Sequence, residues 1–526
     1  MATVADVIVK RLRDAGVRML FGVPGGGGNL DLIEAAGRGG LPFVLTTTET
    51  GGAIAAIAQA EIAHAPGACL TTLGPGAASV VNGVACAYLE RAPIVVFTDS
   101  YASKDRERYA HQRLDHAALL SGITNFSGSL APGLTYGSLE NAFDTLAANP
   151  NGPVHLDCPA DFNAPVPADG EPFPADGRTF TSDTVVSSTE TSGFLRSREG
   201  MLRAARKPLL ILGLGVRRPE HAARIRALCE RVGLPAMVTY KAKGVVPDAH
   251  PWFAGVFTNA AIERPVIDES DLIIGIGLDE VELLPRPWNV KQRIQYGPQA
   301  QSVLQGLREC DECLQPSAWD AKQVQAAVVA AQQQIAIPAA GMTAQQVVRA
   351  AAARLARDAR VTVDAGAHMF AATMLWPVRE PNQMLISNGL STMGFALPAA
   401  IGAALLERDR TVVALTGDGG LLMCLGELLT AVRERLKIIV VVFNDASLSL
   451  IEIKQQARRL TPAGVALGAT DWAAIARGFG AEGVTADDEA GLTRALDQAV
   501  TAGGPTVIDA RIDRSNYGAT MRAIRG

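Results

Sequence analysis

Short apolar runs alternate with longer amphipathic segments along most of the chain, and residues 411–456 show this pattern most clearly. Residues 411–415 form an apolar run rich in β-branched side chains, residues 421–436 carry apolar side chains at helical spacing, and residues 438–443 form a second apolar run. Such runs are typical of strands that are buried on both faces of a sheet. A strand, a helix and a strand in this order predict a βαβ unit with parallel strands.

The same alternation recurs in three parts of the chain, which predicts an α/β fold with three doubly wound parallel-sheet domains. The first domain is expected at residues 1–165, with strands at 18–21, 42–47, 69–73 and 93–98. Residues 166–192 are rich in Pro, Gly, Ser, Thr and Asp and are expected to be a linker. A central domain at 193–335 and a third domain at 336–526 follow, and the first and third domains share one plan.

Composition narrows the function classes. The length of 526 residues corresponds to about three domains, and the net charge of −5 argues against a nucleic-acid partner. We expect no membrane span, since no apolar run reaches the required length of about 18–20 residues. The start of the chain lacks the features of a signal peptide, and seven scattered cysteines suit a reducing cytoplasm. The isolated CxxC at residues 310–313 is expected to be incidental.

The turn between the two strands of residues 411–456 carries candidate chemistry. Asp418 follows the first strand and Asn444 follows the second, so both should lie at the carboxyl edge of the sheet. One carboxylate and one amide oxygen form a suitable half-site for Mg²⁺, which takes its other ligands from phosphates and water. Gly417, Gly419 and Gly420 would let backbone N–H groups approach a diphosphate. The alternative is an ordinary loop, because the tripeptide Gly417-Asp418-Gly419 is common in loops that bind nothing.

Four further segments carry possible site residues or ligand-binding turns. The glycine run at residues 22–28 follows a strand and indicates close approach of the backbone to a ligand or another chain, or else a mobile loop. Glu49 lies where a strand ends and a helix begins, which by default places a carboxylate in the solvated first turn. The charged loop 101–116 contains His111, Gln112 and His116 and is expected to be a solvated surface loop. The GxG at residues 213–215 is a weak nucleotide signal, and the central domain is expected to be mainly structural.

Taken together, several stretches resemble one family over nearly the whole chain. They are residues 21–26 (FGVPGG), the segment around Glu49, residues 73–96, residues 387–405 and the GDGG…FNDASLSLIEIKQQ stretch. The chain resembles the thiamine diphosphate enzymes of the acetolactate synthase, pyruvate decarboxylase and benzoylformate decarboxylase group, with a texture like that of acetolactate synthases. The resemblance implies a pyrimidine-binding domain, a central domain and a diphosphate-binding domain, in that order.

The resemblance also implies site residues and cofactors. Asp418, Asn444 and the Ala446 carbonyl would bind Mg²⁺, and Gly366 and His368 would touch the cofactor's diphosphate. Glu49 would be the carboxylic acid that hydrogen bonds to the aminopyrimidine ring, with a pKa raised by apolar surroundings. Met393 would hold the cofactor bent, and the backbone of Gly389 and Met393 would bind the aminopyrimidine. The departures from flavin-contact motifs in the central domain predict that FAD is absent.

The residues that would contact the substrate are less clearly indicated than those that would bind the cofactor. His111 and Gln112 stand where related enzymes carry either a His pair or a Gln, and Gly26, Leu448 and Ile451 are expected to line the substrate pocket. Glu452 is either a proton relay or an exposed helix acid. The resemblance implies an enzyme that acts on a 2-oxo acid through a C2-bound enamine, by decarboxylation, carboligation or both, with an aldehyde or acyloin-type product. Alternatives are an acetolactate synthase-type condensation and a non-catalytic cofactor-binding paralogue. A homo-oligomer, commonly a dimer of dimers, is expected.

Overall fold

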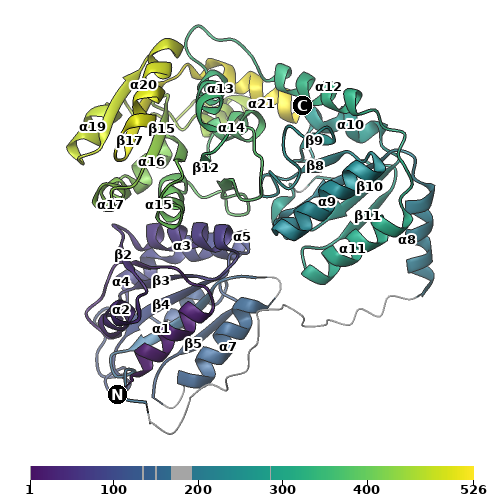
Figure 1. Ribbon diagram of the computed structural model, residues 1–526. Coiled ribbons are helices and arrows are strands. Elements are labelled where there is room, and N and C mark those ends of the chain that lie inside the picture. Colours follow the sequence, from purple (N-terminus) through teal and green to yellow (C-terminus); the bar gives the residue numbers. More distant parts are fainter. Residues whose placement is uncertain (1, 133–134, 149–150, 167–191, 285) are drawn as a thin grey trace. The chain divides into compact units, whose positions relative to one another are not determined.

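The computed structural model describes residues 2–132, 135–148, 151–166, 192–284 and 286–526. These residues form three parallel β-sheets of six, five and six strands, each covered by helices (Figure 1), which confirms the predicted fold class. The chain divides into two compact units. The first comprises Met1–Thr184, Gly389–Asp409 and Cys424–Leu436, and the second comprises Val185–Asn388, Arg410–Met423 and Lys437–Gly526. The predicted linker 166–192 lies outside the described residues except for its two ends.

The sheet of the first unit has the strand order β2-β1-β3-β4-β6-β5, and all its neighbouring strands are parallel. Its strands are β1 (Leu20–Gly22), β2 (Phe43–Leu45), β3 (Gly67–Thr71), β4 (Ile94–Ser100), β5 (Phe126–Ser129) and β6 (Val154–Pro159). The helices of this unit are α1 (Val4–Asp14), α2 (Gly28–Gly39), α3 (Glu49–Ala63), α4 (Pro75–Ser79), α5 (Val81–Glu90), α6 (His116–Leu120), α7 (Thr135–Ala147), α15 (Ala396–Leu406) and α17 (Glu427–Arg433).

Helix α3 is the central helix of this unit. Its sequence, ETGGAIAAIAQAEIA, is apolar on nearly every side, as expected for a helix that is surrounded by protein. It packs against β1 and β3 of the sheet and also against α5 and α15. The small side chains of Ala and Gly let these elements approach closely, and Glu49 is held at the first position of the helix.

The second unit contains the central sheet, with the strand order β11-β10-β7-β8-β9. Its strands are β7 (Pro208–Leu212), β8 (Ala236–Val238), β9 (Phe253–Val256), β10 (Leu272–Ile276) and β11 (Arg293–Tyr296). The helices around it are α8 (Ser192–Ala204), α9 (Pro219–Val232), α10 (Arg264–Glu269), α11 (Ala300–Cys313) and α12 (Ala321–Gln334), with short 3₁₀ turns η1 (Leu214–Val216), η2 (Ala261–Glu263) and η3 (Glu280–Glu282).

The C-terminal sheet of the second unit has the order β13-β12-β14-β15-β17-β16. Its strands are β12 (Arg360–Val363), β13 (Met384–Ile386), β14 (Val412–Gly417), β15 (Ile438–Asn444), β16 (Glu482–Ala486) and β17 (Thr506–Arg511). The accompanying helices are α13 (Ala344–Leu355), α14 (His368–Leu375), α16 (Asp418–Cys424), α18 (Ser449–Ala457), α19 (Trp472–Gly478), α20 (Glu489–Thr501) and α21 (Tyr517–Arg525), with the 3₁₀ turn η4 (Arg514–Asn516).

The first and C-terminal sheets have the same topology, because the strands occur in the same relative order in both. In each sheet the chain moves to one side after its first strand and returns to the other side for its third. The switch points therefore lie between β1 and β3 and between β12 and β14. Ligands of open parallel sheets bind outside the carboxyl ends of the strands at such points. The expected shared plan of the first and third domains is thus confirmed.

One predicted element differs from the structure. Residues 421–436 were expected to form one helix, but α16 ends at Cys424 and α17 begins at Glu427. Gly426 is the residue before α17, and a Cβ added there would lie 2.9 Å from the Thr47 hydroxyl oxygen. The break lets Thr47 approach the backbone.

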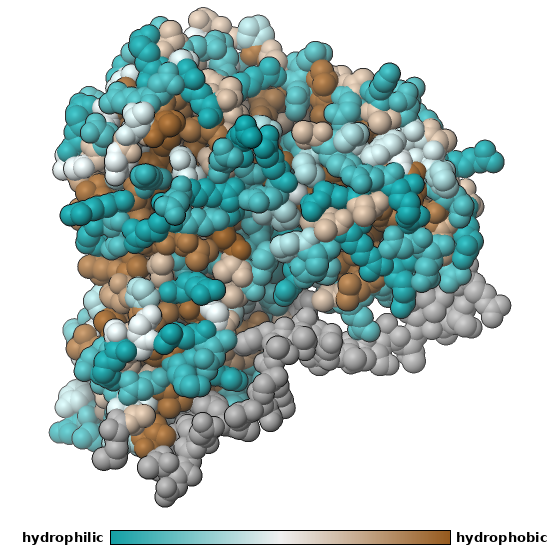
Figure 2. All heavy atoms as spheres, in the orientation of Figure 1, coloured by the Kyte–Doolittle hydropathy of each residue, from teal (hydrophilic) through white to brown (hydrophobic). Residues whose placement is uncertain are grey.

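The surface of the central sheet region is mainly hydrophilic on the face drawn in Figure 2, with small hydrophobic patches between polar side chains. A mixed surface of this kind is ordinary for a globular domain. Among the described residues, no helix is long and apolar enough to cross a membrane.

Candidate active site

Asp418 links the carboxyl ends of β14 and β15. It is the first residue of α16, and only 4% of its surface is exposed. Its Oδ1 accepts a hydrogen bond from the Gly419 N–H at 2.7 Å, and its Oδ2 accepts one from the Ala446 N–H at 2.7 Å. Burial raises the pKa of Asp418, while the backbone donors oppose that rise. A cation at this carboxylate would offset the cost of burying its charge.

Asn444 and Ala446 supply the other two expected metal ligands. The Asn444 amide donates to the Thr470 carbonyl at 3.2 Å and to Asp509 Oδ1 at 2.8 Å, so its Oδ1 remains available as an acceptor. Ala446 has a φ of 56°, an uncommon left-handed conformation for a residue with a Cβ. Its carbonyl accepts one hydrogen bond, from the Leu467 N–H at 2.9 Å, and keeps a second lone pair. These oxygen donors fit a hard cation such as Mg²⁺.

The loop that carries these ligands is held by charged neighbours. Asp445 accepts from the Ser447 N–H and from the Ser449 hydroxyl, and burial, with the nearby charge of Asp418, raises its pKa to about 6. Arg514 Nη1 donates to the Asp445 carbonyl at 2.7 Å, and its Nη2 lies 3.5 Å from Glu452. Glu452 also accepts from the Ser447 hydroxyl at 2.8 Å. Glu452 is therefore a paired, mostly buried acid of this loop rather than an exposed helix acid.

His368 lies beside the same strand ends, at the first position of α14. Its ring stacks on Phe443 with a centroid distance of 4.9 Å, and burial lowers its pKa to about 4. Gly366 and Gly417 both border this ring. His368 Nε2 is buried without a hydrogen-bond partner among the described residues. A buried unpaired polar atom at a switch point is what a polar ligand group would satisfy, so the residues fit a cofactor's diphosphate arm.

The side chains of Thr416 and Asp364 hold the turn of residues 417–420 in place. Thr416, which precedes Gly417 in β14, donates from its hydroxyl to Asp364 Oδ2 at 2.8 Å, and Asp364 follows β12 directly. This hydrogen bond joins the two strand ends at the switch point. Gly420 lies against the Asp364 carboxylate, which leaves no room for a Cβ. The glycines of this turn are thus required by the protein's own packing as well.

Glu49 is positioned by a buried carboxylate of α17. Glu427 is 1% exposed, and it accepts hydrogen bonds from the Thr48 N–H at 2.9 Å, from the Thr48 hydroxyl at 3.0 Å and from the Thr47 N–H. Thr48 in turn caps α3 by accepting from the Gly51 N–H. The Glu49 side chain is half-buried, and within the described chain its carboxyl has no hydrogen-bond partner. Glu49 is therefore presented by a rigid backbone with its carboxyl unengaged.

The segment before α15 is fixed in a similar way. The Gly389 N–H donates to the buried Glu90 at 2.9 Å, and the Thr392 hydroxyl pairs with Asn82. A Cβ on Gly389 would lie 2.5 Å from the Leu89 carbonyl. Met393 follows this anchored segment and is half-buried.

His111 and Gln112 are both exposed. Gln112 lines an open depression of about 390 Å³ together with Gly74, Pro75, Ala78, Ala110, Arg113 and Leu114. This volume is in the usual range for a small-molecule site. The His111 carbonyl accepts from the Tyr101 hydroxyl at 2.6 Å, while its ring carries no contact that ties it to the depression. Gly26 has no neighbouring atom within 4 Å of a built Cβ.

The glycine run after β1 encloses a carboxylate of the protein. Asp99, at the end of β4, accepts from the Asn29 N–H at 2.7 Å and from the Gly27 N–H at 3.2 Å. Burial raises the pKa of Asp99, and these donors oppose the rise. The first glycine run therefore binds an internal anion and is neither a mobile loop nor a ligand cradle at these two N–H groups.

The GxG turn of the central domain is also closed by a carboxylate. Glu282 accepts from the Leu214 N–H at 2.9 Å and from the Thr239 hydroxyl at 2.5 Å, so it spans the ends of β7 and β8. A Cβ on Gly213 would lie 2.7 Å from Glu282, and one on Gly215 would lie 2.6 Å from the Pro298 carbonyl. Burial raises the pKa of Glu282 to about 7. Contacts within the protein thus explain these glycines.

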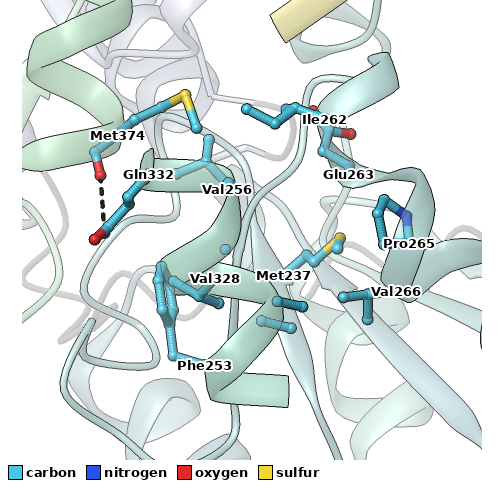
Figure 3. Close-up of a pocket in the computed structure, with 14 residues that line it drawn as sticks. Met237, Phe253, Val256, Ile262, Glu263, Pro265, Val266, Val328, Gln332 and Met374 are labelled. Atoms are coloured by element: carbon cyan, nitrogen blue, oxygen red, sulfur yellow. Dashed lines mark hydrogen bonds between the residues drawn. The ribbon is translucent and has the colours of Figure 1, made fainter. Parts of the chain in front are cut away.

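A second cavity of the central domain is small and apolar. Figure 3 shows side chains such as Met237, Phe253 and Val328 pointing into it, and its volume is about 40 Å³. Its one lining carboxylate, Glu263, is hydrogen bonded to Thr258 and Ala260. Ligand sites for cofactors have volumes of about 300–1,000 Å³. This cavity has room for a few waters and no nucleotide.

The candidate residues therefore form two sets, each described within its own unit. The second unit brings together Gly366, His368, Gly417, Asp418, Gly419, Gly420, Asn444, Ala446, Leu448 and Ile451. The first unit holds Gly26, Glu49, His111, Gln112, Gly389 and Met393. Leu448 is half-buried and Ile451 is exposed. The carboxylates that hydrogen bond to the backbone or side chains around these two sets were not predicted from the sequence. They are Glu427, Glu90, Asp364 and Asp445.

Comparison with known proteins agrees with this arrangement. Residues 2–119 match the thiamine pyrophosphate enzyme N-terminal TPP binding domain, residues 199–303 the central domain, and residues 364–510 the C-terminal TPP binding domain. The chain is 27% identical to an acetolactate synthase of Bacillus subtilis, over 97% of this chain and 93% of that protein. It is 28% identical to the large subunit of acetolactate synthase isozyme 1 of Escherichia coli, over 97% and 94%.

A relative named for a different activity is similar to the same degree. The chain is 28% identical to a probable 2-ketoarginine decarboxylase of Pseudomonas aeruginosa, over 97% of this chain and 94% of that protein. Synthases and a decarboxylase thus occur among the relatives at the same level of identity. With all three domain types matched in order, the chain belongs to the thiamine pyrophosphate enzyme family and is acetolactate synthase-like.

Proposed function

We propose that this chain is a thiamine diphosphate- and Mg²⁺-dependent enzyme that acts on a 2-oxo acid by decarboxylation, by carboligation or by both. The observation that carries the proposal is the oxygen donor set at the ends of β14 and β15. It consists of the buried Asp418, the available Oδ1 of Asn444 and the carbonyl of Ala446. Such a set binds a hard cation whose remaining ligands are phosphate oxygens and water.

Each candidate residue has a defined task in this proposal. When bound, thiamine diphosphate supplies an acidic C2–H and an electron-withdrawing ring on which a 2-oxo acid can lose CO₂. Glu49 would share a proton with a ring nitrogen, His368 and the Gly417–Gly420 turn would face the diphosphate, and Met393 would bend the cofactor. Gln112, which lines the open depression, would orient the carbonyl substrate.

The substrate class follows from the chemistry and from the relatives. The proposed substrate is a small 2-oxo acid, and the product is CO₂ with an aldehyde or an acyloin-type compound. An acetolactate synthase-type condensation of two 2-oxo acids is the first alternative, supported by the two synthases of similar sequence. A non-catalytic cofactor-binding paralogue is less favoured, because the acid Glu49 and the metal pair Asp418 and Asn444 are all present.

We further propose that the central domain holds no FAD. The support is the occupation of its glycine turn by Glu282 and the small size of the Figure 3 cavity. Purified protein, denatured to release any flavin, should show no absorbance near the flavin maximum. A stoichiometric flavin would contradict this part of the proposal.

The activity is tested with purified protein supplied with thiamine diphosphate and Mg²⁺. Pyruvate, benzoylformate, 2-ketoarginine and longer 2-oxo acids are offered singly and in pairs, and CO₂ and carbonyl products are measured. Hydrogen–deuterium exchange at the cofactor's C2 is followed without substrate. The expected result is C2 exchange together with CO₂ release from at least one acid. Absence of both would leave the non-catalytic reading standing.

A further inference from the structure

A buried histidine that the sequence reading assigned to a solvated loop lies in a hydrogen-bond network of the first unit. His116, the first residue of α6, is 3% exposed. Its Nδ1 is 2.8 Å from Asp157 Oδ1, and its Nε2 is 3.2 Å from the backbone N–H of Gly74. His155 and Thr98 complete the cluster, with Thr98 Oγ1 at 2.7 Å from both His155 Nε2 and Asp157 Oδ1.

The proton on each member of the network is fixed by its partners. The Gly74 amide is a donor, so His116 Nε2 accepts and the proton of the neutral ring lies on Nδ1, which donates to Asp157. Thr98 donates to Asp157, so it accepts from His155 Nε2–H, and His155 Nδ1 accepts from the Ser127 hydroxyl at 2.7 Å. Every ring nitrogen is therefore used.

The hydrogen bonds of the two histidine rings disfavour a metal ion in the cluster. His116, His155 and Asp157 place three ligand-type atoms within 4.8 Å of one another. A metal on His116 Nδ1 would displace the ring proton to Nε2, where it would face the Gly74 N–H donor. Burial lowers the pKa of His155 to about 4, and hydrogen bonds from His116 and Thr98 with the attraction of His155 outweigh burial and lower the pKa of Asp157. The ligand-type atoms of the cluster thus already have hydrogen-bond partners within the protein.

The hydrogen-bond network ends at the turn of residues 74–76, which lies beside Glu49. Gly74 has a φ of 57° and its α-carbon packs against the Gln112 carbonyl, so it tolerates no side chain. Gly76 lies on the other side of the turn, where a built Cβ would be 3.1 Å from Glu49 Oε1. The turn therefore separates the Glu49 carboxyl from the segment of Gln112. His116 is hydrogen bonded to the turn and continues the Gln112 segment along the chain.

We propose that His116, anchored by Asp157, is a positioning residue that holds the Gly74–Gly76 turn and thereby sets the orientation of the Glu49 carboxyl. The inference rests on the proposed function, in which Glu49 meets the cofactor. The charged or titratable groups around His116 are Asp157 and His155 on β6, Asp99 on β4 and Arg106 of the preceding loop.

The test compares His116→Phe, which removes both hydrogen bonds, with His116→Gln, which keeps an acceptor near the Nε2 position but does not titrate. Ser127→Ala is the matched control, since it removes one hydrogen bond from the far end of the network. We expect His116→Phe to slow C2–H exchange about tenfold to a hundredfold, the scale for a misplaced catalytic group. Thiamine diphosphate affinity should change by less than about threefold. His116→Gln and Ser127→Ala should exchange at nearly the wild-type rate.

One further measurement does not depend on turnover. Amide hydrogen exchange of the cofactor-free protein should show the peptide containing Gly74 protected in wild type and His116→Gln, and deprotected in His116→Phe. If His116→Phe does not fold, Asp157→Asn replaces it in both measurements, because it removes the carboxylate that anchors His116.

The outcomes are distinct. Equal C2 exchange in wild type and His116→Phe, an equal loss in Ser127→Ala, or a stoichiometric transition metal in the purified protein would each overturn the proposal. If wild type neither binds the cofactor nor exchanges C2–H, the proposed function fails. The positioning of Gly74 is then judged by the amide exchange alone, where equal protection in all variants overturns it.

Discussion

At the scale of single residues, the site is built from carboxylates that the protein buries at a cost and then uses. Asp418, Asp445, Glu427 and Asp99 are all enclosed, and each receives hydrogen bonds from backbone N–H groups or hydroxyls. Asp418 follows β14 and Asp445 follows β15, and the charge of Asp418 adds to burial in raising the pKa of Asp445. A divalent cation at Asp418 would offset the charge of both carboxylates. Asn444 Oδ1, which accepts no hydrogen bond among the described residues, would be a ligand at the same position.

Removal of the Asp418 charge should weaken retention of the metal and the cofactor. We expect Asp418→Asn to lower the affinity for Mg²⁺ and thiamine diphosphate by about 100-fold or more, because even outer-shell changes cost 10- to 100-fold. Cofactor that remains after extensive dialysis with Mg²⁺ measures this effect. Asp497→Asn, at an exposed carboxylate on α20 of the same domain, is the control. Full retention in Asp418→Asn would remove Asp418 from the metal site.

Glu49 is expected to matter for proton transfer more than for binding. Glu49→Gln keeps the size of the side chain but removes the proton that is shared with the cofactor ring. The C2–H exchange rate should fall by about 10²- to 10⁴-fold, the usual contribution of a general acid or base. Binding of thiamine diphosphate should remain close to wild type. Quenched-flow exchange followed by NMR measures the rate, with the exposed Glu34→Gln as control, and an unchanged rate would exclude the assigned role.

At the scale of elements, local sequence patterns predicted the strands well. They did not predict the long-range contacts that hold or divide the helices. The strands expected at residues 93–98, 411–415 and 438–443 overlap β4, β14 and β15, because short buried apolar runs are a local signal. The single helix expected at 421–436 is divided at Gly426, where Thr47 approaches from more than 300 residues earlier. No local pattern carries such a contact.

Among the candidate site residues, those that depend on local patterns were likewise predicted, and those that depend on long-range contacts were not. Asp418 and Asn444 were found because each directly follows a strand of a recognisable βαβ unit. Glu427 and His116 were missed because a charged residue in a helix or a polar loop is by default solvated. Their burial is decided by Thr48 and Asp157, which are distant in sequence. The resemblance to a family supplied roles for Glu49 and Met393 that the residues themselves do not specify.

Glu427 connects two elements, and its removal should loosen both. Glu427→Ala leaves the N–H groups of Thr47 and Thr48 without their buried acceptor, and hydrogen bonds to charged groups contribute about 1.5–3 kcal/mol each. We expect a clear fall in the thermal unfolding midpoint and slower C2 exchange. Glu427→Gln, which keeps one acceptor, should show a smaller change in both. Equal midpoints for wild type and Glu427→Ala would contradict this support.

Glu282 should make the stability of the central domain depend on pH. Its folded-state pKa of about 7 lies above its ordinary value of 4.5, so folding favours the protonated form. The stabilisation is complete below about pH 4.5 and is lost as the pH rises through 7. The difference corresponds to about 3 kcal/mol. In unfolding curves between pH 5 and 8, Glu282→Gln should lose less stability toward high pH than wild type, and parallel curves would refute this.

At the scale of the whole molecule, the first and C-terminal sheets repeat one topology, and each presents candidate residues at its own switch point. The C-terminal sheet carries the residues proposed for the metal ion and the diphosphate, after β12, β14 and β15, and the first sheet carries Glu49 at the start of α3, after β2. The two sets have complementary chemistry, since one offers oxygen ligands for a cation and the other a single carboxyl for a ring nitrogen. A cofactor with a diphosphate at one end and a heterocycle at the other requires both sets.

The expected assembly of four chains gives the last prediction. Leu422 and Met423 on α16 are 46% and 61% exposed, directly after the GDGG turn, and large apolar side chains next to a site are typical of surfaces that become covered. Light scattering should give a mass of about four times 55.1 kDa. Charge at this position, in Leu422→Asp with Met423→Asp, should lower the mass and abolish C2 exchange together. Val500→Asp, at an equally exposed apolar residue of α20, should leave both unchanged. An active monomer would show instead that one chain completes the site by itself.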